Sequence, residues 1–172
     1  TYYVADHVKA KRKVAFVHTD YNRVGYNREL DQNCYSQMNW IFTVSDEARK
    51  SFIAVYPEHA KRVSVFHNLI NWNRIRSKAE QKGGFTDGYT GMRLLTVGRL
   101  IREKALELSV QAMKLLKDEG IQARWYVLGE GEARASLRRL IRKLGLEQDF
   151  LLLGSTDNPY PYYKQADIYV HA

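Results

Sequence analysis

The sequence predicts an α/β fold with parallel β-sheets, arranged as two partial domains. Short apolar segments alternate with amphipathic helical patterns along most of the chain. The apolar segments are nearly continuous, which is typical of strands that are buried on both faces. Because a helix lies between successive strands, the connections are crossovers, and crossovers join parallel strands. A glycine-containing stretch that ends near residue 91 interrupts the pattern and separates the two parts.

The first part, residues 1–71, is predicted to alternate strands with helices. Apolar and β-branched residues predict strands at residues 13–18, 40–44 and 62–67. Helical patterns fill the intervals, around residues 26–38 and through residues 50–55. Ser45 precedes the second helix, where its hydroxyl can accept a hydrogen bond from a backbone N–H of the first turn.

Residues 72–91 are predicted to link the two parts. A short basic helix comes first, and a flexible turn follows, because no apolar periodicity continues after Ala79 and glycines recur up to Gly91. In the second part, residues 92–172, strands are predicted at residues 92–97, 124–128, 150–153 and 168–170. Apolar faces mark its helices, at Leu108, Ala112, Leu115 and Leu116, at Leu137, Leu140, Ile141 and Leu144, and near residues 162–166. Gly120 is the expected C-terminal stop of the first of these helices.

The composition is that of a folded protein. Of the 172 residues, 45% are apolar and 27% are charged, which are ordinary values for a globular domain. No apolar run approaches the roughly 20 residues of a membrane-spanning helix, so a transmembrane helix is excluded. The net charge of +8 indicates anionic partners such as nucleic acid, anionic lipid or phosphorylated small molecules. Cys34 has no second cysteine to pair with, and we expect it to be a buried structural thiol.

A candidate anion site follows the strand at residues 92–97. Gly98 and Arg99 come directly after this strand, and Lys104 is expected to open the next helix. Glycine lets a ligand approach the backbone, arginine binds phosphate oxygens bidentately, and lysine adds a point charge. A helix N-terminus also favours anions. The alternative, that both cations are solvated loop residues, is about equally supported by the residues alone.

Other patterns carry less information. Gly129 and Gly131 begin a dinucleotide-binding fingerprint, but Arg134 occupies its third glycine position, so a tight strand-to-helix turn is the better interpretation. His18 ends the first strand and is expected to face the crevice of its own sheet, although a lone histidine more often has a structural role. No metal-ligand spacing includes it, so no metal site is predicted.

A basic run occupies residues 134–143, on the helix that follows. Such a run is usually a solvated helix face, and attraction to an anionic membrane surface is the sharper interpretation. Nucleic acid is not an expected partner, because neither a binding motif nor interleaved aromatic residues on an exposed sheet can be recognised.

These motifs, taken in order, resemble glycosyltransferase family 4, the group 1 glycosyltransferases, which have the GT-B architecture of two Rossmann-like domains. The resemblance is strongest over residues 94–172. It rests on Leu95-Thr96-Val97-Gly98-Arg99-Leu100 with Glu103-Lys104, on Val127-Leu128-Gly129-Glu130-Gly131, on Leu144-Gly145-Leu146 with Leu152-Leu153-Gly154, and on Ala166-Asp167-Ile168-Tyr169-Val170. Upstream, residues 18–21, 44–45 and 65–71 are similar to landmarks of the family's first domain. Each motif is weak alone, whereas their common order is specific and covers nearly the whole chain.

The resemblance implies a retaining transfer of a sugar from a nucleotide diphosphate sugar to an acceptor hydroxyl. Residues 1–71 would be the C-terminal part of the N-terminal, acceptor-side domain. Residues 72–91 would be the interdomain linker, and residues 92–172 the first part of the nucleotide-sugar-binding domain. The parent protein would be a hexosyltransferase-type enzyme.

The resemblance also implies roles for particular residues. Arg99 and Lys104, beside Gly98, match the residues that bind the donor diphosphate. The loop Gly154-Ser155-Thr156 matches the one that lies against the base, and His18 matches the catalytic histidine that approaches the donor sugar. Neither a cofactor nor a metal is expected, because the cations and a helix N-terminus stabilise the departing diphosphate.

Residues 158–163 resemble a variant found among bacterial polysaccharide enzymes, so a UDP-sugar and a glycan or lipid-linked acceptor are expected. The implied location is the cytoplasm, and a lipid-linked acceptor would allow peripheral contact with the inner face of the plasma membrane. Two positions depart from the family pattern, because Ala105 and Leu69 each replace a usual glycine. The family's glycine-rich loop would precede Thr1 and its paired glutamates would follow Ala172. We therefore expect this chain alone to show little or no transfer.

Two alternatives stay open. A GT-B epimerase that acts on nucleotide sugars would share the fold, although the Gly98-Arg99 and Glu103-Lys104 segment argues against it. A non-catalytic binding subunit derived from the same fold would be indicated by loss of both glutamates.

Overall fold

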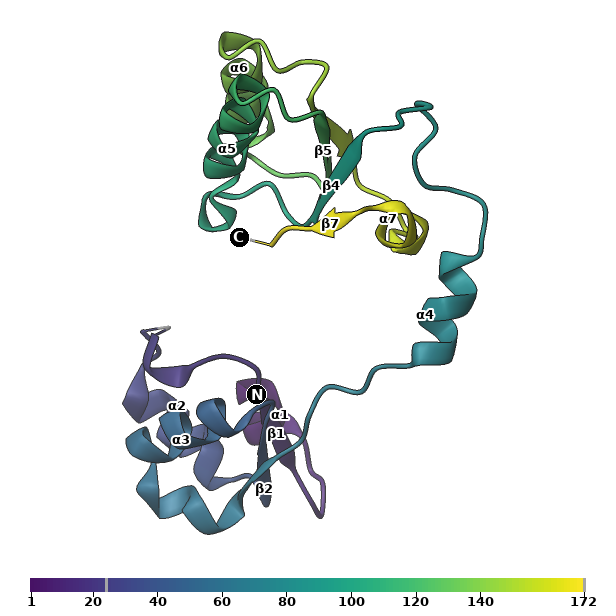
Figure 1. The fold of residues 1–172 in the computed structure, drawn as a ribbon. Helices are drawn as coiled ribbons and strands as arrows, with labels where there is room; N and C mark the ends of the chain where they lie inside the picture. The colour runs from purple at the N-terminus through teal and green to yellow at the C-terminus, as the bar shows by residue number, and fades with distance from the viewer. Residues whose placement is uncertain (24, 172) are drawn as a thin grey trace. The chain divides into compact units, whose positions relative to one another are not determined.

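The computed structural model describes residues 1–23 and 25–171. The chain forms two compact units, Thr1–Ile70 and Asn71–Ala172, and each is described by itself (Figure 1). The residues predicted as a linker, 72–91, lie within the second unit in this division. Within the described part of the chain, no helix is both long and apolar enough to cross a membrane.

The first unit is a three-stranded parallel sheet with helices between its strands. Its elements in chain order are α1 (Tyr2–His7), β1 (Val14–Val17), η1 (Tyr21–Arg23), α2 (Arg28–Ser36), β2 (Trp40–Thr43), α3 (Asp46–Val55), η2 (Pro57–Arg62) and β3 (Val63–Val65). The strand order is β1-β2-β3. Ser45 caps α3 as predicted, since its hydroxyl oxygen accepts a hydrogen bond of 3.1 Å from the Ala48 N–H.

Helices cover only one face of this sheet. Ala15 and Val17 of β1 and Ile41 of β2 are buried in a core with residues of α2 and α3, which lie on one side of the strands (Figure 1). Val14 and Phe16, which point to the other face, are 50% and 44% exposed. The prediction that this strand is buried on both faces is therefore wrong for the described residues, because no element of the unit covers the second face.

The second unit is a four-stranded parallel sheet. Its elements are α4 (Trp72–Ala79), β4 (Met92–Val97), η3 (Arg102–Lys104), α5 (Leu106–Asp118), β5 (Ala123–Leu128), α6 (Arg134–Lys143), β6 (Phe150–Gly154), α7 (Tyr160–Gln165) and β7 (Ile168–Tyr169). The strand order is β6-β5-β4-β7. All seven predicted strands of the chain are present, with ends that shift by two residues at most. Gly120 follows α5 with a φ of +75°, as a C-terminal stop requires.

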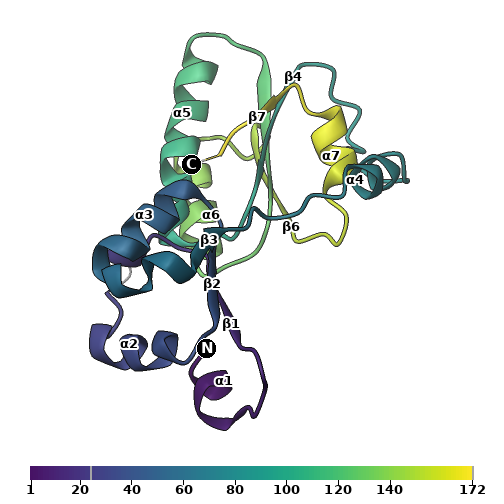
Figure 2. The same ribbon diagram turned by 90° about the horizontal axis from the view of Figure 1, so that it is seen from below.

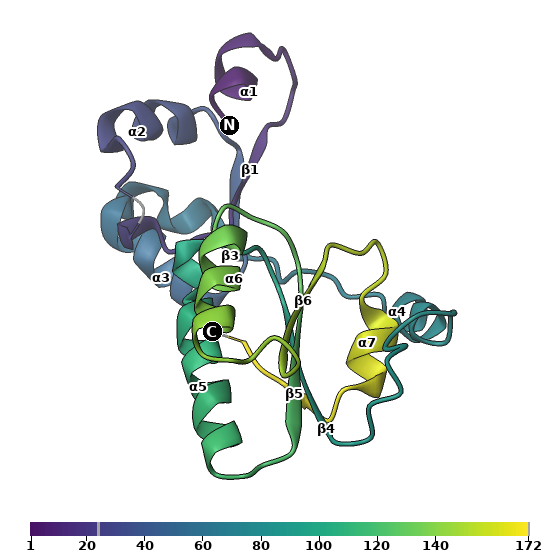
Figure 3. The same cartoon turned by 90° about the horizontal axis from the view of Figure 1, so that it is seen from above.

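Helices cover both faces of the second sheet. α5 and α6 lie on one face and α7 on the other, where α4 packs against α7 (Figures 2 and 3). The larger core forms under α5 and α6, where Val110, Leu137 and Val127 are fully buried. On the opposite face Leu95, Tyr126 and Leu128 are buried against Phe85 and Tyr162. The α/β fold with parallel sheets is thus confirmed. In the second unit, the pairing of the strands determines where their carboxyl ends lie.

Residues 84–91 are tied to the sheet by Asp87. Its carboxylate accepts hydrogen bonds from Arg124 Nη1 at 2.8 Å and from Tyr126 Oη at 2.6 Å, and it lies 3.5 Å from Arg93 Nη2. Burial acts to raise the pKa of Asp87, but the hydrogen bonds from Tyr126, Arg124 and the backbone N–H of Tyr89 outweigh it and hold the pKa well below its usual range. The segment predicted as a flexible turn is therefore bound to β5 and is not free of contacts.

Candidate functional site

Three neighbouring strands of the second unit end at the same edge of the sheet. β4, β5 and β6 run parallel, so the segments that follow them meet beyond their carboxyl ends, where open α/β sheets bind ligands. Backbone hydrogen bonds join these segments. The Gly98 N–H donates to the Leu128 carbonyl at 2.9 Å, the Leu100 N–H to the Glu130 carbonyl at 2.9 Å, and the Gly129 N–H to the Gly154 carbonyl at 2.8 Å.

Gly129 and Gly131 are required by this close approach. A Cβ at position 129 would lie 1.8 Å from the Gly98 carbonyl oxygen, and a Cβ at position 131 would lie 2.3 Å from the Leu100 carbonyl oxygen. Both contacts are with backbone, which cannot move aside as a flexible side chain does. The two glycines therefore serve the packing of one loop against another, in agreement with the prediction of a tight strand-to-helix turn.

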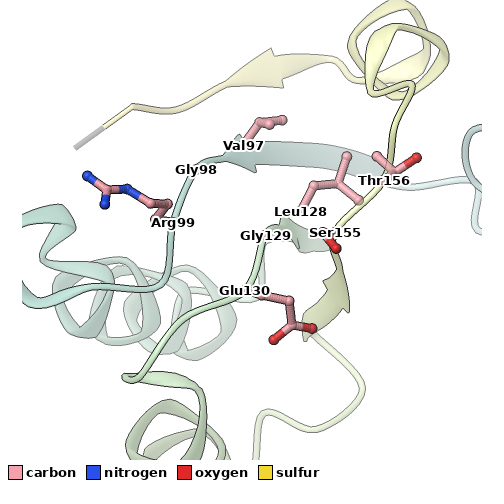
Figure 4. Close-up of a pocket in the computed structure, with 8 residues that line it drawn as sticks. All are labelled: Val97, Gly98, Arg99, Leu128, Gly129, Glu130, Ser155 and Thr156. Carbon is pink, nitrogen blue, oxygen red and sulfur yellow. The ribbon is translucent and has the colours of Figure 1, made fainter.

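These loops surround a pocket of about 410 Å³. Figure 4 shows its lining residues, which are Val97, Gly98, Arg99, Leu128, Gly129, Glu130, Ser155 and Thr156. A small cavity beside it shares Val97, Gly98 and Arg99 and is also lined by Thr96, Lys104, Leu106 and His171. Gly98 and Arg99 thus lie where the two spaces meet.

The two predicted phosphate-binding cations occupy different places. Arg99 is exposed, and its side chain extends away from Ser155 and Thr156 (Figure 4). Lys104 is half-buried and lines the small cavity rather than the large pocket. The expectation that Lys104 opens the next helix is wrong, because Lys104 ends η3 and α5 begins at Leu106.

Ala105 separates the two helices in an unusual conformation. Its φ of +43° and ψ of +36° place it in the left-handed region, and it is the one non-glycine residue with positive φ in the described part of the chain. A side chain disfavours this conformation, whereas glycine adopts it freely. The turn therefore explains why glycine is usual at this position in the family that the sequence resembles.

The Lys104 ammonium is held by a residue that follows β7. Its Nζ lies 3.0 Å from Nε2 of His171, and Nδ1 of the same ring lies 3.1 Å from Oη of Tyr169. The Tyr169 ring packs on Tyr163, with centroids 5.0 Å apart. Burial of Tyr163 and its hydrogen bond with Tyr169 raise the pKa of Tyr163.

The far side of the large pocket is formed by the segment after β6. Gly154 ends this strand with a φ of +90°, and the exposed Ser155 and Thr156 follow it. Glu130 also lines the pocket, and its carboxylate accepts a hydrogen bond of 2.7 Å from Arg134 Nη1. Because Arg134 Nη2 also donates to the Leu152 carbonyl at 3.1 Å, this ion pair is anchored to β6.

His18 belongs to the first unit. It follows β1 with an exposed side chain, and its ring stacks on that of Phe16 with centroids 6.1 Å apart. Its assignment as the catalytic residue stays a prediction. Elsewhere in residues 1–23 and 25–171, no group of three His, Cys, Asp or Glu side chains is arranged to hold a metal ion.

Sequence reasoning did not assign Glu130 or His171 to the site. Glu130 stands between the two glycines of the predicted strand-to-helix turn, and the position of this turn after a strand is the signal that places Glu130 at the ligand-binding edge. His171 follows the last strand in the same way. The strand pattern predicts that His171 follows a strand, but it does not predict that this strand pairs with β4.

The second unit has a cation-bearing pocket at the carboxyl ends of the strands of a parallel α/β sheet. This arrangement is typical of ligand-binding α/β proteins. A family model described as "Glycosyl transferases group 1" matches residues 81–172, which is more than half of the chain. The chain therefore belongs to the group 1 glycosyltransferases.

Two curated relatives agree with this assignment. The "N-acetylgalactosamine-N,N'-diacetylbacillosaminyl-diphospho-undecaprenol 4-alpha-N-acetylgalactosaminyltransferase" of Campylobacter jejuni is 27% identical over 159 residues, which are 92% of this chain and 41% of that protein. A glycosyltransferase of Methanocaldococcus jannaschii is 30% identical over 142 residues, 79% of this chain and 34% of the relative. The chain thus spans well under half the length of either relative.

Solved structures share the fold. The structure of HepE from Anabaena in complex with UDP matches 93% of this chain and 46% of its own, with a TM-score of 0.72 and 14% identity. The pneumococcal O-GlcNAc transferase GtfA in complex with UDP and GlcNAc matches 94% of this chain and 33% of its own, with a TM-score of 0.68 and 18% identity. The fold is therefore that of the GT-B glycosyltransferases, represented by parts of two Rossmann-like domains.

Proposed function

We propose that the second unit binds the diphosphate of a nucleotide sugar beside Arg99 and Lys104, and that a protein containing this chain transfers the sugar with retention of configuration. The observation that carries the proposal is the pocket of about 410 Å³ at the carboxyl ends of β4, β5 and β6, with Arg99 on its wall. The nucleotide is proposed to be UDP, the ligand named in the HepE and GtfA structures.

The charges around the pocket favour one orientation of the nucleotide. Arg99 lies at the side of the large pocket that adjoins the small cavity, which Lys104 also lines. Ser155 and Thr156 lie on the opposite side of the large pocket (Figure 4). A diphosphate beside the two cations would leave the nucleoside next to Ser155 and Thr156. The carboxylate of Glu130 does not oppose an anion strongly, because it is paired with Arg134.

The two cations would act on the leaving group of the transfer. Cleavage of the bond between the sugar and the diphosphate leaves a negative charge on the diphosphate, and fixed cations stabilise that charge as it forms. The guanidinium of Arg99 can bind two phosphate oxygens at once, and the ammonium of Lys104 can contribute a compact charge. We assign to His18 the catalytic role beside the donor sugar, on the resemblance of residues 18–21 to the family pattern.

The acceptor is proposed to be a glycan or a lipid-linked sugar, supported by the name of the Campylobacter jejuni relative, whose acceptor is a diphospho-undecaprenol. The first unit would then serve the acceptor and the second the donor. The proposed location is the cytoplasm, and a lipid-linked acceptor would bring the protein into peripheral contact with the membrane that carries its substrate.

Titration calorimetry of the chain with UDP, GDP and ADP tests the donor site. UDP should bind most tightly, and Arg99→Ala and Lys104→Ala should each weaken it by about tenfold or more, the effect of losing a charged hydrogen bond. Arg102→Ala is the matched control, because it removes the same charge three residues from Arg99 at a position that lines neither cavity. Unchanged affinity in both site variants, or an equal loss in the control, would contradict the assignment.

The catalytic assignment needs a transfer assay of a protein that contains this chain together with the remaining length of its relatives. His18→Ala should lower kcat by about a hundredfold, within the range for loss of a positioned acid–base group. His7→Ala, an exposed histidine of the same unit, should leave kcat unchanged. A His18→Ala variant with full kcat would remove His18 from the mechanism.

A further inference from the structure

His171 and Lys104 come together through the pairing of two strands that are far apart in the sequence. β7 runs beside β4, with Leu95 opposite Tyr169. The Val170 N–H donates to the Leu95 carbonyl at 2.8 Å, and the Thr96 hydroxyl donates to the Val170 carbonyl at 2.9 Å. These bonds hold the backbone before His171 against the strand that leads to Gly98 and Arg99.

The contact favours one tautomer of the neutral His171 ring. A lysine ammonium has only donors, so Nε2 of His171 must accept the bond of 3.0 Å from Lys104 Nζ. A ring that accepts at Nε2 and is neutral carries its proton on Nδ1, and Nδ1 then donates to Tyr169 Oη at 3.1 Å. The order of hydrogen bonds is therefore Lys104 to His171 to Tyr169.

The same contact restricts a flexible side chain. Lysine has a four-carbon stem and loses about 2 kcal/mol of rotamer entropy when it is held in one place. A ligand that must first immobilise such a side chain binds more weakly than one that meets it already in position. Lys104 is only half-buried, so packing alone leaves its ammonium free to turn, whereas the His171 ring gives it one acceptor beside the pocket.

We infer that His171, oriented by Tyr169, is a positioning residue that holds the Lys104 ammonium ready for the diphosphate of the nucleotide. The inference rests on the proposed function, since it concerns the same ligand. It predicts that His171 acts on the nucleotide through Lys104 and not by direct contact. His171 and Lys104 both line the small cavity and neither lines the large pocket, so a double-mutant cycle is needed to separate action through Lys104 from direct contact.

A double-mutant cycle in UDP affinity tests the inference. His171→Ala should weaken UDP about fivefold, the effect of one hydrogen bond. In the Lys104→Ala background the same substitution should have no further effect, because its target is absent. His171→Gln should restore most of the affinity, because its side-chain oxygen can accept from Lys104. Tyr169→Phe should give part of the loss, and His7→Ala none.

The ring tautomer gives a second readout that needs no nucleotide. Imidazole ¹⁵N shifts of the free chain should report the Nδ1–H form of His171, and Lys104→Ala should abolish that preference. An Nε2–H ring in the unaltered chain, an unchanged UDP affinity in His171→Ala, or an undiminished loss in the Lys104→Ala background would each overturn the inference. If the tautomer is found but Lys104→Ala leaves UDP affinity unchanged, the pairing stands, and the proposed function and the inferred role in nucleotide binding both fail.

Discussion

Gly129 lies so close to Gly98 that a Cβ added to it would fall 1.8 Å from the Gly98 carbonyl oxygen. The loop after β5 is thereby packed directly against the backbone of the loop that carries Arg99. The Gly98 N–H also donates a hydrogen bond to the Leu128 carbonyl. The position of Arg99 therefore depends on the close approach of the two loops. The pocket wall is thus built by backbone contact between neighbouring loops.

Gly129→Ala should therefore damage both stability and binding. The new methyl group would displace the Gly98 backbone, and a φ of +151° already disfavours a side chain, so we expect a loss of about 3 kcal/mol in the stability of the second unit. UDP affinity should fall by more than tenfold. Urea unfolding and calorimetry check the two effects.

Gly120→Ala is the control for Gly129→Ala. Position 120 has a positive φ of +75°, but a Cβ there would meet no atom within 4 Å. It should cost only the left-handed strain of about 1 kcal/mol and leave UDP affinity unchanged. Equal effects of the two substitutions would show that the contact with Gly98 is unimportant.

Asp87→Asn should loosen residues 84–91 at neutral pH. The folded-state pKa of Asp87 is depressed, so its contribution to stability is present above the unfolded-state pKa of about 3.9 and is lost as the pH falls through the folded-state value. We expect a cost of about 1–2 kcal/mol at pH 7 for this partly exposed group, and a smaller cost at pH 3.

Hydrogen exchange of the β4 and β5 amides, measured at both pH values, separates this effect from unfolding of the first unit. Asp118→Asn is the control, since Asp118 is 55% exposed and pairs with Lys114 on the same helix. The interpretation fails if the cost of Asp87→Asn is the same at both pH values.

The strands were predictable because a parallel strand is marked by its own residues. The runs at 92–97 and 124–128 need no knowledge of their neighbours, and their alternation with helices places Gly98, Arg99 and Ser155 at the ligand-binding edge. The pairing of β4 with β7 was not predictable in this way. This pairing joins two segments that are separated in the sequence by two other strands. The contact between Lys104 and His171 therefore depends on the order of strands in the sheet, which local sequence patterns do not predict.

Two further differences have physical causes outside the local pattern. Val14 and Phe16 read as part of a doubly buried strand, but burial depends on what packs against each face, and α2 and α3 cover only one. Ala105 gave no sign of a left-handed turn, because alanine is the residue that most favours a regular helix. The one indication of an unusual backbone conformation at position 105 was that the family which the sequence resembles usually has glycine there.

Cys34 should be unreactive in the folded chain. It is 4% exposed, and burial raises the pKa of its thiol, so little thiolate forms at pH 8 and reagents cannot reach it. A thiol-specific chromogenic reagent should label less than one tenth of the protein in native buffer over the time in which urea-unfolded protein reacts fully. Rapid labelling of the native chain would contradict the burial of Cys34.

Ala105→Gly should stabilise the second unit, although alanine-to-glycine changes in helices usually destabilise. Relief of the left-handed strain is worth about 1–2 kcal/mol, and the added freedom of glycine in the unfolded chain takes back about 0.4–1 kcal/mol. A net gain of about 0.5–1 kcal/mol remains, measurable by urea unfolding.

Ala112→Gly, inside α5, should instead destabilise the second unit, with a loss of about 1 kcal/mol in the free energy of unfolding. Ala105 lines neither cavity, so Ala105→Gly should also keep UDP affinity within about twofold, the change that a few tenths of a kcal/mol produces. If both alanine-to-glycine substitutions destabilise equally, Ala105 is not strained, and the turn between Lys104 and α5 does not require glycine. A stabilised variant with weakened UDP binding would instead show that the strain at Ala105 serves the placement of Lys104.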